Sequence, residues 1–270
     1  MKLNLHTHST FSDGICTPTE LVDKQVAEGI EVMSLTDHDS VNGIDEAMER
    51  GRERGIKVLS GIELSCYGTF EIHILGYNID YKNPAFVEKL DVIRNMRRAR
   101  VLKTIQCLAD NGVVLDTSNL NFDDCNLGRL HIAKQMVKQG YSVSVNEAFN
   151  HYLGTDKPAH ISGMRARPFE VVQLICQFGG VAVLAHPITI PKNNLELLVA
   201  RLCDYGLIGI ESYYATNNET DTKTFLGLAK KYNLINTCGT DYHDENGYIS
   251  PSYTNSAVDA RSLRRLGIIK

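Results

Sequence analysis

The sequence predicts an α/β fold in which helices cover a largely parallel sheet, open or closed into a barrel. Short apolar segments typical of buried strands alternate with helical patterns, and that alternation favours parallel strands. Ligand-type side chains also recur near the ends of these segments, as expected where strands meet on one face of a barrel. The seven predicted strands span residues 2–5, 32–36, 58–62, 71–76, 181–185, 208–211 and 235–239.

Helical patterns fill most of the gaps between these strands. The first begins with Pro18 at an early helical position and stops at Gly29, and the second ends at Gly55. The predicted helices of this layer span residues 18–28, 42–54, 168–178, 195–205 and 220–232.

Histidine and acidic residues lie at or near the end of every predicted strand. Polar residues are common after strands, but this residue choice after all seven indicates a single site. The residues concerned are His6, His8, Asp37, His38, Glu63, His73, His186, Glu211, Asp241 and His243.

The spacing of these residues predicts the connections. Steps of 25 or 30 residues, as from His8 to His38, fit one strand–helix unit, but the ten residues from Glu63 to His73 are too few for a crossover helix. That pair is expected to form a hairpin through Tyr67 and Gly68.

The interval from His73 to His186 is too long for one crossover and predicts an inserted subdomain. Its helical patterns span residues 83–111, 128–138 and 146–152. We therefore expect a barrel domain of residues 1–83 and 166–270, with a helical cap of residues 84–165 over the strand ends.

Composition excludes several classes of protein. A net charge of −4 lacks the strongly basic signature of a nucleic-acid-binding chain, and no segment has the length of a membrane helix. The seven cysteines are scattered without a CxxC pair, which favours reduced thiols. With no visible signal peptide, a cytoplasmic location is expected, with no membrane contact and no stable protein partner.

The histidines predict a metal site. His6 and His8 lie two residues apart at a strand end, so their side chains point the same way, and Asp13 follows closely. Six imidazoles with carboxylates and no thiolate suit Mn, Fe or Zn better than Ca or Mg. The candidate ligands are His6, His8, Asp13, His38, Glu63, His73, His186, Asp241 and His243.

These residues stand in motifs that resemble the PHP (polymerase and histidinol phosphatase) family. The motifs are H6-T-H8-S-x-x-S-D13-G, L-T36-D37-H38-D39, G61-I62-E63, H73-I-L-G-Y, A185-H186-P187 and G239-T-D241-Y-H243. The resemblance covers nearly the whole chain and is greatest to small phosphoesterases acting on 3′,5′-bisphosphonucleotides or short RNA. It implies a distorted seven-stranded β/α (TIM-like) barrel holding three divalent metals.

The resemblance also implies how the ligands are shared. His6, His8, Glu63 and Asp241 would bind the first metal, and Glu63 would bridge to a second held by His73 and His186. Asp13, His38 and His243 would hold the third. Family members often have His where this chain has Asp13, and Asp is the form in the branch that it resembles.

Phosphate chemistry follows as a hypothesis. Three carboxylates and three divalent ions leave a charge of about +3, which suits a phosphate dianion and a hydroxide supplied by the metals. Asp37 could protonate the leaving group, although a role in holding His38 is slightly favoured. Glu211 is expected to support the site or the fold rather than bind metal.

Basic residues of the insertion are candidate phosphate contacts. Arg94, Arg97 and Arg98 share one helix face, which could equally be a solvated surface. Arg129, in the motif G-R-L-H-I-A, matches the family and is the preferred phosphate ligand. His160 is a further candidate, and Tyr213 and Tyr214 could line a base pocket or pack in the core.

The leading hypothesis is therefore a metal-dependent phosphomonoesterase, acting on nucleotides with two phosphates or on the 5′ ends of short oligonucleotides. The alternatives are histidinol-phosphate phosphatase, an amidohydrolase-like C–N hydrolase, and a non-catalytic metal-binding domain. The arginines and the third metal set argue against C–N hydrolysis, and the complete ligand set argues against a degenerate domain.

Overall fold

The computed structural model describes residues 1–270 except 67–69, 71, 123–126, 162, 245–246 and 248–257. The chain divides into two compact units. One comprises residues 1–88 and 166–270, called the barrel unit, and the other residues 89–165, called the helical unit. The insertion was predicted at 84–165; its proposed place over the strand ends stays a prediction.

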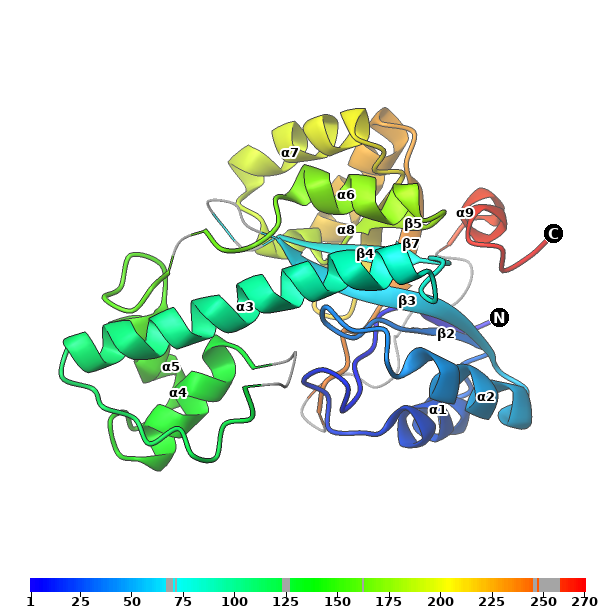
Figure 1. The fold of residues 1–270 in the computed structure, drawn as a ribbon. Helices are drawn as coiled ribbons and strands as arrows, with labels where there is room; N and C mark the ends of the chain where they lie inside the picture. Colours follow the sequence, from blue (N-terminus) through cyan, green and yellow to red (C-terminus); the bar gives the residue numbers. More distant parts are fainter. Residues whose placement is uncertain (67–69, 71, 123–126, 162, 245–246, 248–257) are drawn as a thin grey trace. The chain divides into compact units, whose positions relative to one another are not determined.

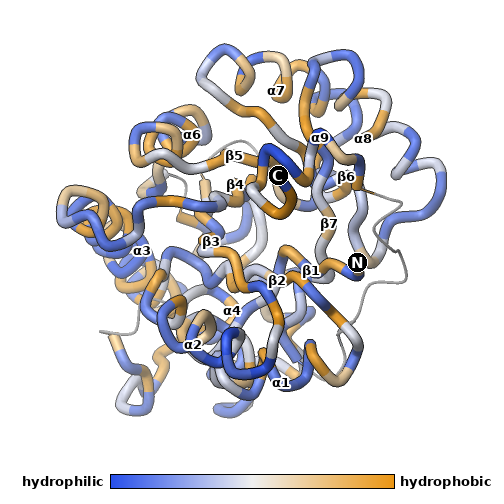
Figure 2. Tube along the Cα trace, turned by 90° about the vertical axis from the view of Figure 1, so that its right-hand side faces the viewer, coloured by the Kyte–Doolittle hydropathy of each residue, from blue (hydrophilic) through white to orange (hydrophobic). Residues whose placement is uncertain are grey.

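The barrel unit contains one seven-stranded sheet in sequential strand order. Its first and last strands meet, because Leu5 N donates a hydrogen bond to Cys238 O and Asp241 N donates one to His6 O. Figure 2 shows the strands as a ring with β1 (Leu3–Asn4) beside β7 (Ile235–Gly239). The predicted TIM-like barrel is thereby confirmed. The strands are β1 (Leu3–Asn4), β2 (Val32–Leu35), β3 (Lys57–Cys66), β4 (Ile72–Tyr77), β5 (Val181–Leu184), β6 (Gly209–Tyr214) and β7 (Ile235–Gly239).

One strand runs against the others. β4 pairs antiparallel with both β3 and β5, whereas the remaining neighbouring pairs are parallel. The expectation that every strand carries its ligand near its carboxyl end is therefore wrong for His73, the second residue of β4. Because β4 is reversed, its amino end lies at the end of the barrel where its neighbours finish. The predicted hairpin turn at Tyr67 and Gly68 lies outside the described residues.

Helices lie outside the ring of strands (Figures 1 and 2). Thr17 caps the start of α1 (Pro18–Ala27) and forms a capping box with Glu20. Helix α2 (Ile44–Arg54) is followed by Gly55, whose φ of 73° suits a residue without Cβ. The helices around the strands are α1 (Pro18–Ala27), α2 (Ile44–Arg54), α6 (Pro168–Gln177), α7 (Lys192–Asp204) and α8 (Glu219–Lys231).

The C-terminal segment, which was not predicted to form any element, closes the amino end of the barrel. Helix α9 (Ala260–Arg265) contributes Leu263 to the barrel core, together with Leu266. Ser262 Oγ accepts a hydrogen bond from Asn236 N at 2.9 Å, and Asn78 Nδ2 donates to Leu266 O at 2.9 Å. These contacts seal the end of the barrel opposite the carboxyl ends of the parallel strands.

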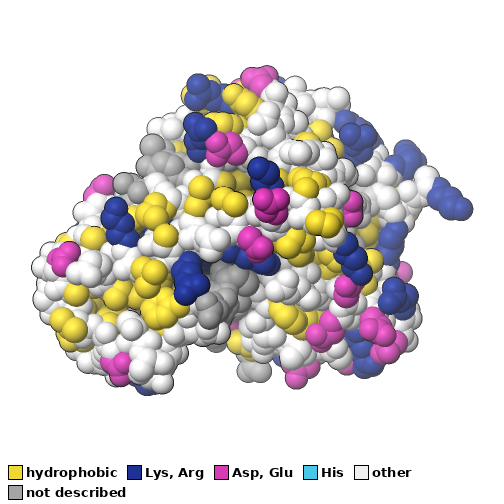
Figure 3. All heavy atoms as spheres, in the orientation of Figure 1, with side chains coloured by type: hydrophobic (Ala, Val, Ile, Leu, Met, Phe, Trp, Pro, Cys, Tyr) yellow, Lys and Arg dark blue, Asp and Glu magenta, His cyan; other side chains and the backbone are white. Residues whose placement is uncertain are grey.

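The helical unit has a core of its own. Helix α3 (Pro84–Asp110) starts within the residues of the barrel unit and continues into the helical unit. It is followed by α4 (Arg129–Lys138), α5 (Val145–Ala148) and a π-helical turn at Phe149–Leu153. Leu108, Ile132 and Met136 are fully buried there. Other apolar side chains of this unit, including Val114 and Val143, are exposed, and Figure 3 shows several on its surface. Among the described residues, no helix meets the length and apolarity needed to cross a membrane.

Candidate metal centre

The nine predicted ligands all belong to the barrel unit, and the structure brings them together around the Glu63 carboxylate. Glu63 Oε1 lies 3.0 Å from both His73 Nδ1 and His186 Nε2. Its Oε2 atom faces three further imidazole nitrogens, His38 Nδ1 at 3.0 Å, His8 Nε2 at 3.3 Å and His6 Nε2 at 3.4 Å. One buried carboxylate therefore contacts five imidazoles.

Asp241 completes the first group of possible ligands. Its Oδ1 atom lies 2.9 Å from His8 Nε2 and 3.2 Å from His6 Nε2. One atom each from His6, His8, Glu63 and Asp241 therefore fall within 4.8 Å of one another. This is the set that the family resemblance implies for a first metal.

Asp13 lies within a second group of possible ligands. Its Oδ1 atom lies 3.1 Å from His243 Nε2 and 3.8 Å from His8 Nδ1, and its Oδ2 atom lies 3.9 Å from His38 Nε2. His8 thus belongs to two groups, which the sequence did not predict.

The third group contains Glu63, His73 and His38, with His186 Nε2 only 3.2 Å from His73 Nδ1. His38, assigned by sequence to one metal, can reach two positions. Glu63, His8 and His38 each belong to two of the three groups, so ions bound in these groups would be neighbours.

Several atoms at the centre are buried without hydrogen-bond partners among the residues that the structure describes. Buried polar atoms are normally hydrogen-bonded, so a cluster of exceptions requires an explanation. Imidazole nitrogens and carboxylate oxygens that face one another in this way fit divalent cations bound between them. The atoms are His6 Nε2, His8 Nε2, Asp13 Oδ1, His38 Nδ1, Glu63 Oε2 and Asp241 Oδ1.

The pKa values of the histidines in the metal-free centre also favour a site for cations. Burial lowers the pKa of His8, but the close carboxylates of Asp241 and Glu63 outweigh burial and raise that pKa to about 10. Burial also opposes protonation of His6, yet the charges of Glu211, Asp241 and Glu63 raise its pKa well above the usual value. The carboxylates therefore favour positive charge at the centre, which protons on these two rings supply in the metal-free protein.

Glu211 supports the ligands from behind. Its Oε1 atom lies 3.1 Å from His6 Nδ1, and its Oε2 atom accepts a hydrogen bond from His186 N at 2.7 Å. A carboxylate at Nδ1 fixes the ring so that Nε2 faces the centre. This geometry supports the expectation that Glu211 positions ligands rather than binding metal.

Asp37 has a different partner from the one expected. Its carboxylate accepts hydrogen bonds from Ser9 N, Ser9 Oγ and Ser12 Oγ, rather than holding the ring of His38. Ser12 Oγ in turn lies 3.2 Å from His8 Nδ1. Asp37 therefore secures the 9–12 turn and, through Ser12, the orientation of His8, and its hydrogen bonds support a positioning role over that of an acid.

The backbone around the site is tightly constrained. His186 and Asp241 have φ values of 21° and 54°, in a region that side chains rarely adopt. At Gly239 an added Cβ would lie 2.2 Å from the His6 Cβ, so the motif preceding Asp241 requires glycine. The loop that carries Asp241 thereby packs directly against the His6 strand.

Tyr214, predicted to line a base pocket or pack in the core, lies against the metal ligands. Its hydroxyl donates to Asp241 Oδ2 at 3.0 Å, and its ring centroid lies 5.7 Å from that of His186. Tyr213, in contrast, packs against the barrel core. Strand alternation could have predicted which of the two tyrosines faces the site, but a bulge between Glu211 and Tyr213 shifts the register of β6.

The predicted phosphate-binding residues all lie in the helical unit. Arg94 Nη1 pairs with Asp91 Oδ1 at 3.0 Å. Arg129 Nη1 donates to Leu153 O at 3.3 Å, and its guanidinium lies 5.7 Å from the Phe149 ring centroid. Arg97 and His160 are half-buried and Arg98 is exposed. A role in substrate binding stays a prediction for all five.

Comparisons with known proteins agree with this geometry. The PHP domain profile matches residues 4–150. The chain is 30% identical to a 5′-3′ exoribonuclease of Haemophilus influenzae over 96% of both chains, and 32% identical to a 3′,5′-nucleoside bisphosphate phosphatase of Chromobacterium violaceum over 89% of this chain and 87% of that one. A solved structure described as an amidohydrolase from Chromobacterium violaceum, with bound sulfate and no metal, has a TM-score of 0.85 at 29% identity, covering 99% and 96% of the two chains.

Proposed function

Because the chain belongs to the PHP domain family, we propose that it is a metal-dependent phosphoesterase that hydrolyses phosphate monoesters of nucleotides. Its substrates would be 3′,5′-bisphosphonucleotides or the 5′ ends of short oligonucleotides. The observation that carries the proposal is the convergence of six imidazoles and three carboxylates, with buried atoms that lack hydrogen-bond partners among the described residues.

Three divalent ions, of Mn, Fe or Zn, would occupy the centre. His6, His8, Glu63 and Asp241 would hold one, and Asp13, His38 and His243 another. Glu63, His73 and His186 would hold the third, with His38 within reach. Such ions supply Lewis acidity and a water that ionises near neutral pH.

The protein's own contribution is to keep these donors in place before substrate arrives. Glu211 and Ser12 occupy the Nδ1 atoms of His6 and His8, which leaves both Nε2 atoms directed at the centre. Tyr214 likewise occupies Asp241 Oδ2 and leaves Oδ1 directed toward the imidazoles. Donors oriented in advance would hold the metals without reorganisation during the reaction, and the metals would supply the contacts to phosphate oxygens.

Arg129 is proposed to bind a substrate phosphate. Replacing Arg129 by Ala is expected to lower kcat/KM by roughly 10–100-fold, because a charged bidentate contact is lost, while metal content stays unchanged. Phosphate-release kinetics and metal analysis of the purified variant test this. Loss of metal from the variant would contradict the assignment.

A substrate panel tests the proposed function. The Mn-loaded protein would be given adenosine 3′,5′-bisphosphate, a 5′-phosphorylated oligonucleotide, histidinol phosphate and an N-acyl amino acid. Phosphate or nucleotide release from either of the first two, with the highest kcat/KM, is the expected result. Faster turnover of histidinol phosphate or of the amide would favour those alternatives, and no turnover of any substrate would contradict enzymatic activity.

A further inference from the structure

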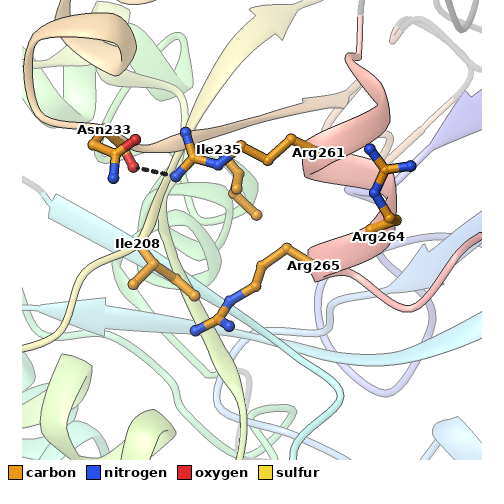
Figure 4. Close-up of a pocket in the computed structure, with 6 residues that line it drawn as sticks. All are labelled: Ile208, Asn233, Ile235, Arg261, Arg264 and Arg265. Carbon is orange, nitrogen blue, oxygen red and sulfur yellow. Dashed lines mark hydrogen bonds between the residues drawn. The ribbon is translucent and has the colours of Figure 1, made fainter. Parts of the chain in front are cut away.

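A cavity lies away from the metal ligands, at the other ends of two of the strands that carry them. It has a volume of about 530 Å³ and is lined by Ile208, Asn233, Ile235, Arg261, Arg264 and Arg265 (Figure 4). Ile208 directly precedes β6 and Ile235 begins β7, whereas Tyr214 and Asp241 stand at or beyond the other ends of these strands. The cavity is therefore at the amino end of the barrel, where the proposed reaction uses no residue.

The charge of this cavity is strongly positive. Its three arginines come from α9, and none of them forms an ion pair within the described parts of the chain. In α2, by contrast, Arg50 and Arg54 both pair with Asp23. An uncompensated group of guanidinium groups around a cavity favours an anionic ligand.

Two of the arginines are directed into the cavity. Figure 4 shows Arg261 and Arg265 extending from α9 toward the strands, with the two isoleucines between their guanidinium groups in this view. Arg261 Nη2 donates to Asn233 O at 2.7 Å, which fixes its side chain at the rim. Two separated guanidinium groups can each bind one phosphate.

The favourable interaction of cations with a helix C-terminus does not account for this set. Arg264 and Arg265 lie in the last turn of α9, where a positive charge is stabilising. Arg261 lies in the first turn, where the helix dipole disfavours a cation. Its hydrogen bond to Asn233 O, rather than the helix dipole, holds it at the cavity rim.

The floor of the cavity indicates an organic ligand. Both isoleucines line the cavity, but Ile235 is 2% exposed, so the apolar surface open to a ligand belongs mainly to Ile208, which is only partly buried against the barrel core. The volume lies within the usual range for small-molecule sites. We propose that this cavity binds a nucleotide with two phosphates, the arginines holding the phosphates and Ile208 contacting the base, independently of the metal centre.

Calorimetric titration of the full-length protein with ADP and with inorganic pyrophosphate tests the proposal. Arg265→Gln and Arg261→Gln are expected to weaken ADP binding roughly tenfold or more. Arg201→Gln is the matched control, because this exposed arginine of α7 is outside the cavity and its loss changes the net charge equally. ADP should bind more tightly than pyrophosphate, because Ile208 contacts the base.

Four results would overturn the proposal. They are no ADP binding by the unmodified protein, no weakening in the Arg265 variant, equal weakening in the Arg201 control, and equal affinity for pyrophosphate and ADP. Arg265 has no hydrogen bond within the described residues, so its replacement tests the site even if Arg261→Gln impairs folding.

Discussion

Replacing Glu63 by Gln is expected to lower kcat/KM for phosphate release by about 10³-fold or more and to remove at least one metal ion per chain. The Glu63 oxygens lie 3.0–3.4 Å from five imidazole nitrogens, so the amide removes the shared negative charge and turns a donor group toward other ligands. A metal that stabilises transition-state charge contributes several kcal/mol, which corresponds to a loss of this size.

Metal analysis and phosphate-release kinetics on the same preparation measure both effects of Glu63→Gln. Glu219→Gln is a matched control, because the Glu219 side chain is 93% exposed and pairs only with Lys223 among the described residues. A Glu63→Gln protein with unchanged metal content and turnover would show that this carboxylate does not bridge metals.

Metal binding is expected to release about two protons per chain at pH 7 and to tighten steeply as pH rises. In the metal-free centre the pKa of His8 is raised to about 10 and that of His6 is also well raised, so both rings carry protons at pH 7. Burial lowers the pKa of His38 to about 4, and this ring is already neutral. Each proton that metal must displace makes the apparent affinity about tenfold higher per pH unit.

Because two protons are displaced, we expect the affinity for Mn²⁺ to be about 100-fold higher at pH 8 than at pH 7. Ordinary imidazoles are already largely neutral at pH 7, so they would not produce this increase. Burial raises the pKa of Glu63 and Asp241, but the neighbouring histidines lower both well below the usual range, so these carboxylates release no proton. Titration calorimetry in two buffers with different ionisation enthalpies counts the protons. Affinity independent of pH from 7 to 8 would contradict the protonated state of His6 and His8.

The sequence predicted most of the barrel because its signals are local. Each strand is a short apolar segment bounded by turn residues or a helix, and the ligand-type residues stand at the barrel end where such strands finish. The short step from Glu63 to His73 predicted the reversed β4, although hydrophobic pattern carries no strand direction. Helix α9 was missed, since only six residues with little apolar periodicity form it.

The supporting contacts could not be predicted because they join distant segments. Glu211 contacts His6 across 205 residues of sequence, and Asp37 reaches His8 only through Ser12. Which ligands are shared depends on side-chain directions within the closed barrel, as at His8 and His38. Sequence spacing fixes which strand supplies a ligand, but not which neighbours its two nitrogen atoms will face.

The most direct test of the account is a metal titration monitored by catalysis. The protein would be stripped with a chelator, returned to defined amounts of Mn²⁺, and assayed for phosphate release from adenosine 3′,5′-bisphosphate. We predict no turnover in the stripped protein and restoration that levels off near three ions per chain. Full turnover without metal, or saturation at a single ion, would contradict a centre in which nine side chains share several cations.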